Sequence, residues 1–192
     1  VSNYKYNSKG GSGKASNIFE IPMPDEFRGK YRGKGAGNKY FIEFEKIISK
    51  AKKANKKISA MIVEPIISCG GQIELPEKFL KKCKKILDRE NILLIVDEVQ
   101  TGFGRVGEKF WGFQLHDVIP DIVTLGKPMG NGHPIGAVVC TTEISKKFDN
   151  GLEFFSSFGG NPVSCRIANE VISEIDSRNL QKNALKTGKF LV

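Results

Sequence analysis

Three apolar runs of the strand type each end in an ionisable residue, and they follow one another at intervals of about 30 residues, the length of one βα unit. The runs are ISAMIVE at 58–64, NILLIVD at 91–97 and DIVTLGK at 121–127. Apolar residues at helical spacing occupy the intervals between them. Because each helix returns the chain to begin another strand in the same direction, this alternation predicts an α/β fold with a mostly parallel sheet.

A further strand is expected at 135–140, IGAVVC, directly after the short connection PMGNGHP. A parallel crossover needs about a dozen residues, so this strand is predicted to run antiparallel to its predecessor. Amphipathic helices are expected over 40–51, from Pro76 onwards and over 162–175. Together these elements predict a three-layer architecture, with helices covering a sheet that has one antiparallel strand.

The net charge of +9 raises the question of a nucleic-acid or membrane partner. The lysines fall mainly in KIISKAKKANKK and EKFLKKCKKILDRE, which are predicted to be solvated helix faces without interleaved aromatic residues. No apolar run approaches the roughly 20 residues that span a bilayer, and the first residues lack the apolar core of a signal peptide. We therefore expect no nucleic-acid or membrane partner and a cytoplasmic location, with a mitochondrial one left open.

The four cysteines lie far apart, with no CxxC pair and no histidine cluster at zinc spacing. This pattern predicts neither a disulfide framework nor a metal site. We expect reduced, buried thiols, because free cysteine is among the residue types most often found in protein interiors.

The three ionisable strand ends are predicted to share one site. In an open α/β sheet, ligands bind outside the carboxyl ends of the strands, where Glu64, Asp97 and Lys127 would lie. An aspartate and a lysine in one crevice form a simple ion pair in many proteins. They are also the pair that pyridoxal phosphate (PLP) requires, since the lysine forms a Schiff base and the carboxylate keeps the pyridine nitrogen protonated. The residue types alone leave both possibilities open.

Longer motifs resemble the class III aminotransferases, which are PLP-dependent enzymes of fold type I. Three segments carry the resemblance, and they cover nearly the whole chain. They are IVEPI...CGGQ...P at 62–76, LLIVDEVQTGFGRVGEKFWGFQ...PDIVTLGKPMGNGHPIGAVV at 93–139, and FSSFGGNPVSC at 155–165. The resemblance implies part of the large PLP-binding domain at 39–178, preceded by a loop-rich lead-in at 1–38. Residues 179–192 would begin the connection toward a small domain.

Position by position, the resemblance implies a role for each matching residue. Lys127 would be the Schiff-base lysine and proton shuttle, and Asp97 the partner of the pyridine nitrogen. Val99 would pack on one face of the ring, Gln100 would lie near the ring hydroxyl, and Glu64 would lie on the substrate side.

One cofactor contact is expected to cross between subunits. Relatives commonly place a threonine before GGNP, and its hydroxyl reaches the cofactor phosphate of the neighbouring subunit. Ser157 stands at that position here, so the hydroxyl is kept and the methyl group is absent. The resemblance therefore also implies a homodimer in the complete enzyme.

Glu98 and Arg105 are given structural roles. Adjacent residues of an extended chain point in opposite directions, so Glu98 is predicted to face away from Asp97 and to pair with an arginine or a backbone amide. Arg105 is either that partner or a loop anchor. Phe110, Trp111 and Phe113 are predicted to pack in the core or at an interface.

The reaction is left open between two branches of the family. Four segments most resemble the phospho-lyases that act on phosphoethanolamine or phosphohydroxylysine: SCGGQ at 68–72, RGKYR at 28–32, the opening S-x-YKY at 2–6, and GKPMGNGHP at 126–134. DEVQTGFGR and FWGFQ are shared with transaminases of the alanine–glyoxylate or omega-amino type. The phosphate loop, the ring-stacking aromatic residue and the small domain of relatives are not recognisable, so we expect a fragment that is inactive when isolated. A non-catalytic remnant or binding module is the alternative from another class.

Overall fold

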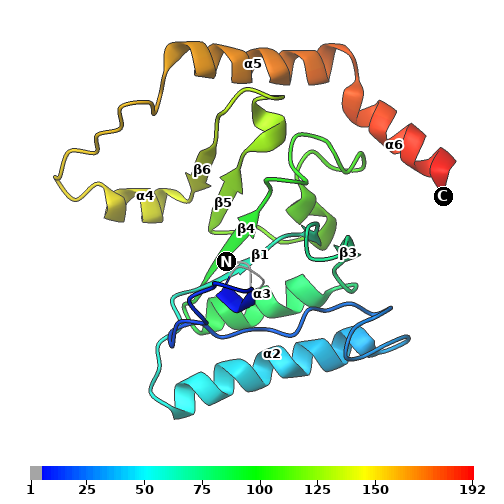
Figure 1. Cartoon of the computed structure of the whole chain (residues 1–192), viewed down its shortest axis with the longest axis vertical. Coiled ribbons are helices and arrows are strands. Elements are labelled where there is room, and N and C mark those ends of the chain that lie inside the picture. Colours follow the sequence, from blue (N-terminus) through cyan, green and yellow to red (C-terminus); the bar gives the residue numbers. More distant parts are fainter. Residues whose placement is uncertain (1–5) are drawn as a thin grey trace.

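A four-stranded sheet forms the centre of the protein in the computed structural model, which describes residues 6–192 (Figure 1). The strands lie in the order β1 (Ala60–Val63), β4 (Leu93–Asp97), β5 (Ile122–Leu125) and β6 (Ala137–Cys140). The β1–β4 and β4–β5 pairs are parallel, and the β5–β6 pair is antiparallel. The predicted α/β class, with one antiparallel strand after a short connection, is confirmed.

Helices lie on both sides of these strands. In Figure 1, α2 (Ala36–Lys53) and α3 (Phe79–Arg89) lie together on one side, whereas α5 (Pro162–Ser177) and α6 (Leu180–Leu191) lie on the other. Tyr40, Phe44, Leu80 and Leu87 of α2 and α3 are buried in one apolar core with Leu94 of β4. The apolar helix faces that the spacing predicted therefore form the contact between these helices and the sheet.

Five short elements were not predicted. They are the hairpin of β2 (Ile66–Ile67) and β3 (Ile73–Glu74), helix α4 (Thr142–Phe148), and the 3-10 helices η1 (Gly112–His116) and η2 (Lys127–Met129). Each is too short to show a hydrophobic period, which is the main signal for secondary structure in a sequence.

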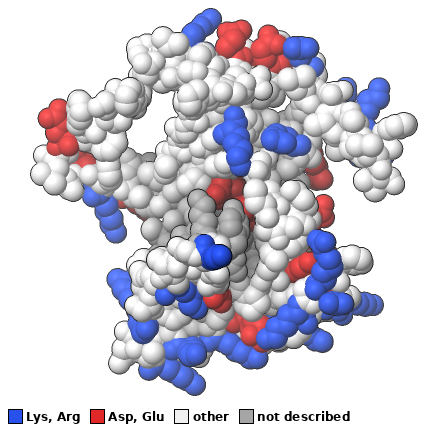
Figure 2. All heavy atoms as spheres, viewed as in Figure 1, with Lys and Arg blue, Asp and Glu red and all other residues white. Residues whose placement is uncertain are grey.

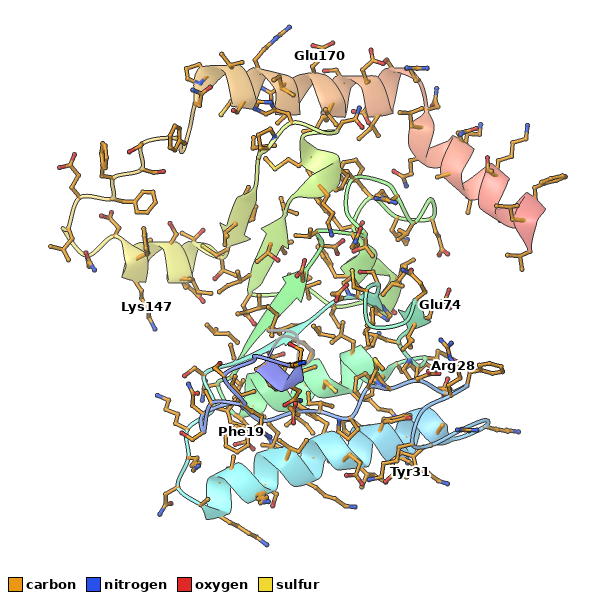
Figure 3. The ribbon with its side chains drawn as sticks, viewed as in Figure 1. Phe19, Arg28, Tyr31, Glu74, Lys147 and Glu170 are labelled. Carbon is orange, nitrogen blue, oxygen red and sulfur yellow. The ribbon has the colours of Figure 1, made fainter. Side chains whose placement is uncertain are left out.

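The lead-in segment contains no helix or strand between residues 8 and 35, as its composition predicts, but it is held against α2. The buried Tyr40 hydroxyl donates to the Asp25 carbonyl oxygen and accepts from the Tyr31 amide, both at 3.0 Å. Tyr31 lies beside α2 in Figure 3, and its hydroxyl donates to Glu43 at 2.7 Å. Residues 2–5 of the motif S-x-YKY lie outside the described part of the chain, and the domain division at residue 38 stays a prediction.

Charged side chains gather over α2 and α3. Figure 2 shows Lys and Arg concentrated at this end of the molecule with acidic groups among them. Lys52, for example, pairs with Glu90 at 2.7 Å. The predicted solvated helix faces are therefore confirmed. No helix within residues 6–192 is both long and apolar enough to cross a membrane.

The cysteine prediction is confirmed for one thiol and wrong for two. Cys83 is fully buried in the core, and burial is the main cause that raises the pKa of its thiol to about 12. Cys69 and Cys165 are exposed, because they lie in the β2–β3 turn and on the outer face of α5. All four cysteines are free, and no cluster of three or more His, Cys, Asp or Glu with metal-site geometry occurs in the described chain.

Helix α6 packs against the glycine loop that follows β4. A Cβ built on Gly107, whose φ is +75°, would lie 2.6 Å from the backbone nitrogen of Leu185. The Gln181 side chain also donates to the Gly107 carbonyl oxygen at 3.1 Å. This close approach of two backbones explains why a glycine is required at this position.

Gly107→Ala is therefore expected to lower the free energy of unfolding by about 2–4 kcal/mol, since it combines left-handed strain with a backbone clash. Gly13→Ala is the matched control, because Gly13 has a φ of +76° and no atom within 4 Å of its added Cβ. Chemical denaturation of the two variants compares strain plus clash with strain alone. Equal losses in the two variants would show that the contact with α6 contributes nothing.

Candidate active site

The register of the parallel strands places the ionisable strand ends at one edge of the sheet. Val63 pairs with Val96, so Glu64 and Asp97 follow at the same level of adjacent strands. Asp97 in turn pairs with Thr124 of β5, three residues before Lys127. The structure thus brings Glu64, Asp97 and Lys127 to the same edge, as the spacing predicts.

The two carboxylate oxygens of Asp97 differ in their hydrogen bonding. We call an atom uncommitted when it forms no hydrogen bond or ion pair with a described residue. Oδ1 of Asp97 accepts a hydrogen bond from the Val99 amide at 2.9 Å, which fixes the orientation of the carboxylate. Its Oδ2 accepts no hydrogen bond from residues 6–192, and no ion pair joins it to Lys127 in that range. The simple Asp97–Lys127 ion pair is therefore not formed, and a half-buried carboxylate oxygen is left for another donor.

Val99 connects the end of β4 to the segment that carries Lys127. A Cβ built on Gly126 would lie 3.5 Å from Cγ2 of Val99, in ordinary van der Waals contact. Gln100, the next residue, directs its amide nitrogen toward the sulfur of Cys69 at 4.0 Å. The turn after β4 therefore lies between the Lys127 segment on one side and the β2–β3 turn on the other.

Lys127 lies in an unusual backbone conformation at the start of η2. Its φ is +28°, which is sparsely populated by residues other than glycine. The Gly126 carbonyl accepts from the Met129 amide at 2.9 Å, and Pro128 fixes the next φ inside this short turn. The Lys127 side chain is exposed and has no hydrogen bond or ion pair within the described chain. Such strain often marks a functional residue.

Glu64 is held by the turn between β2 and β3. Its Oε2 accepts from the Ser68 amide at 3.1 Å and from the Ser68 hydroxyl at 2.6 Å. The same turn is held by Arg28, which donates to the Gly71 carbonyl oxygen at 3.1 Å. Oε1 of Glu64 accepts no hydrogen bond from the part of the chain that is described.

Glu98 is fully buried and faces away from this edge. Its carboxylate accepts from the amides of Gly112 and Phe113 and from the Thr101 hydroxyl. The predicted pairing with a backbone amide is confirmed, whereas Arg105 is exposed and forms no ion pair with Glu98 within residues 6–192. The aromatic residues next to η1 pack on one another, with ring centroids 4.9 Å apart for Phe110 and Trp111, as expected.

Ser157 lies in the exposed segment between α4 and α5, which extends away from the strands in Figure 1. No hydrogen bond joins its hydroxyl to another described residue. The start of α5 is nevertheless anchored near the Lys127 loop, because His133 Nε2 lies 2.8 Å from the Ser164 hydroxyl oxygen. The structure therefore does not bring Ser157 to Asp97 and Lys127 within one copy of the chain.

Sequence reasoning missed Ser68 and Thr101 as supporting residues. Both hydroxyls are buried and donate to carboxylates at the strand ends, at 2.6 Å for Ser68 and 2.7 Å for Thr101. The only signal for them is their position three or four residues after an acid, at which a short turn brings a hydroxyl back to the carboxylate.

Comparisons with known proteins identify the family of the chain. The family model described as aminotransferase class-III matches residues 2–192. Alanine–glyoxylate aminotransferase 2-like from Drosophila melanogaster is 42% identical over 198 residues, covering 100% of this chain and 40% of the relative. Ethanolamine-phosphate phospho-lyase homolog 1 from Caenorhabditis elegans is 34% identical over 204 residues, covering 100% and 44%.

A solved structure shows the same fold. The phospholyase from Arthrobacter in complex with phosphoethanolamine superposes with a TM-score of 0.76 at 37% identity, over 81% of this chain and 37% of that one. The chain thus spans about 40% of the length of the curated relatives given above. The predicted resemblance is confirmed, and the chain belongs to the class-III aminotransferase family of PLP-dependent enzymes.

Proposed function

We propose that this chain supplies the lysine half of a PLP-dependent active site. The observation that carries the proposal is the arrangement of Asp97, whose Oδ1 is fixed by the Val99 amide while Oδ2 is uncommitted. The amine of Lys127 is also uncommitted, at the end of the adjacent strand. An oriented acceptor and a free amine at one sheet edge are what the cofactor needs from the protein.

The residues present fit the cofactor. Oδ2 of Asp97 would accept from the protonated pyridine nitrogen, and Lys127 would bind the aldehyde carbon covalently. Val99, in the turn that directly follows Asp97, would contact the ring, and the Gln100 amide would lie near the ring hydroxyl. When bound, PLP supplies an aromatic ring that accepts electrons from the substrate. The Lys127 amine is then the group in this chain that can take a proton from the substrate and return it.

For the substrate, we propose an amine that carries a phosphate group, such as phosphoethanolamine or phosphohydroxylysine. The relatives named as phospho-lyases and the SCGGQ turn support this proposal. The turn holds Glu64 by one carboxylate oxygen, so the other oxygen can accept from a substrate ammonium group. A transaminase is the second candidate, because the Drosophila relative is named as one.

A second copy of the chain is proposed to complete the site with Ser157. Leu152, Phe154, Phe155 and Phe158 of the same segment are each at least 73% exposed. Four large apolar side chains this exposed are typical of a surface covered by a partner. Sedimentation of the complete enzyme tests the proposed homodimer.

Borohydride trapping tests the proposed cofactor chemistry. The complete natural enzyme is incubated with PLP, reduced and digested, and the expected result is a pyridoxyl adduct on Lys127 alone. The Lys127→Ala variant should give none. Absence of an adduct in the unsubstituted enzyme would favour the non-catalytic remnant.

A product assay separates the two reactions. With phosphoethanolamine, a phospho-lyase releases equal amounts of phosphate and ammonia. A transaminase instead converts pyruvate or glyoxylate into the corresponding amino acid. Keto-acid conversion without phosphate release would overturn the lyase proposal and leave the cofactor proposal standing.

A further inference from the structure

The carboxylate of Glu98 is fully buried, and among the described residues it accepts hydrogen bonds from neutral donors only. Oε2 accepts from the Thr101 hydroxyl at 2.7 Å and from the Gly112 amide at 2.9 Å, and Oε1 accepts from the Phe113 amide at 2.7 Å. No cation forms an ion pair with it within residues 6–192. A buried charge of this kind is costly unless its hydrogen bonds are all made, so it is tightly bound to these three donors.

These donors join two separate parts of the candidate site. Thr101 belongs to the turn after β4, whereas Gly112 and Phe113 begin η1. The far end of η1 is fixed to the segment after β1, because His116 Nε2 lies 2.8 Å from the Pro65 carbonyl oxygen. A Cβ on Gly112 would lie 2.8 Å from Cγ of Pro65, so η1 and Pro65 are in close contact. Glu98 therefore connects the ends of β4 and β1 through η1.

The same turn carries the groups assigned to the cofactor. The Glu98 carbonyl accepts from the amides of Thr101 at 3.2 Å and Gly102 at 2.9 Å, which closes the turn around Val99 and Gln100. The Val99 amide in turn orients Asp97. The conformation of the turn thus determines the direction of the Asp97 carboxylate and of the Gln100 amide.

We propose that Glu98 is a positioning residue, whose carboxylate holds this turn against η1 and so keeps Asp97 and Gln100 aligned for the cofactor. The proposal rests on the proposed PLP function. It differs from a purely structural role in one consequence. Loss of the carboxylate should alter cofactor affinity and protonation, and not only the stability of the protein.

Glu98→Gln is the informative substitution, because it keeps the shape and removes one acceptor. Whichever way the new amide turns, its NH₂ group faces a backbone N–H of Phe113 or Gly112, donor against donor. Glu108→Gln is the matched control, since Glu108 is exposed on the same loop. Thr101→Val removes one hydrogen-bond donor to Glu98, and Thr101→Ser keeps it. These two variants perturb the carboxylate less and serve as the test if Glu98→Gln does not fold.

The experiment measures PLP affinity of the apoenzyme, the pH midpoint of visible absorption of the bound cofactor, and thermal stability. We expect Glu98→Gln to bind PLP roughly tenfold more weakly and to shift the pH midpoint, because a buried donor is left unpaired. Glu108→Gln should stay within about twofold of the unsubstituted enzyme, as surface changes usually do. Thr101→Val should show a smaller loss that Thr101→Ser restores.

Unchanged affinity and an unchanged pH midpoint in Glu98→Gln, with a normal Lys127 adduct, would overturn the positioning role alone. The positioning role is likewise overturned if Thr101→Val loses thermal stability and keeps the affinity. If the unsubstituted enzyme forms no Lys127 adduct, the proposed function fails and the positioning role fails with it.

Discussion

Lys127→Ala is expected to lower kcat of the complete enzyme by at least about 10³-fold, because it removes both a covalent nucleophile and a general acid–base group. The structure supports a chemical reason for this loss. The Lys127 side chain is exposed and makes no hydrogen bond or ion pair within the described residues, so its removal breaks no contact there. The strained φ of +28° remains in the variant, and stability should change little.

Two further variants serve as controls. One tests whether the positive charge alone is sufficient, and the other tests whether the loss of any exposed lysine lowers activity. Lys127→Arg keeps the positive charge, but a guanidinium that stays protonated cannot form a Schiff base, so it should be as inactive as the alanine variant. Lys109→Ala removes an exposed lysine on the loop before η1 and should leave kcat unchanged. Added methylamine should partly restore turnover to Lys127→Ala, since a small amine can replace the missing proton carrier. Activity of Lys127→Ala within tenfold of the unsubstituted enzyme would contradict the assignment.

The convergence of the strand ends could be predicted because it depends on the spacing of the apolar runs and on the length of the connections between them. Apolar runs about one βα unit apart allow few arrangements, and a short connection before the last strand excludes a parallel crossover. Register then follows from burial, as Leu94 and Val96 face the core while the intervening residues do not. Asp97 and Lys127 reach the same edge of the sheet by this reasoning alone.

The internal contacts of the site could not be predicted in the same way. The bonds of Glu64 to Ser68 and of Glu98 to Thr101 depend on turns whose dihedral angles leave no hydrophobic period. The exposure of Cys69 has the same origin, since its place is set by a turn between two-residue strands. The burial preference of cysteine holds for Cys83 in the core, whereas local geometry overrides it at Cys69 and Cys165.

The position of Ser157 illustrates a different limit. Its segment is exposed throughout residues 151–163, and no hydrogen bond from residues 6–192 fixes where the hydroxyl points. The resemblance assigns it to the cofactor phosphate of a neighbouring subunit, a role that a single chain cannot display. Contacts that the core of a chain determines can be predicted from its sequence. An intersubunit contact lies outside that core and cannot be predicted in this way.

Asp97→Asn is expected to lower kcat by about 10²–10³-fold, comparable to the loss of a charged group that stabilises a transition state. Asparagine can still accept from the Val99 amide through Oδ1, so the turn is retained. Its NH₂ group then occupies the place of the uncommitted Oδ2 and presents a donor to a protonated pyridine nitrogen. Asparagine at this position could not accept from a protonated pyridine nitrogen, so PLP held there would be a poorer electron acceptor.

Steady-state kinetics and pH-dependent absorption of the bound cofactor measure this effect. The fall should appear mainly in kcat, whereas Asp176→Asn, at an exposed position of α5, should leave both readouts unchanged. Asp97→Glu keeps the charge but moves it by one methylene, so it should recover part of the activity without recovering the orientation that the Val99 amide imposes. Unaltered absorption of the cofactor in Asp97→Asn would contradict the assignment of Asp97. A protonated pyridine ring that lies against an amide donor cannot keep its spectrum, so the pyridine nitrogen would have to bind elsewhere.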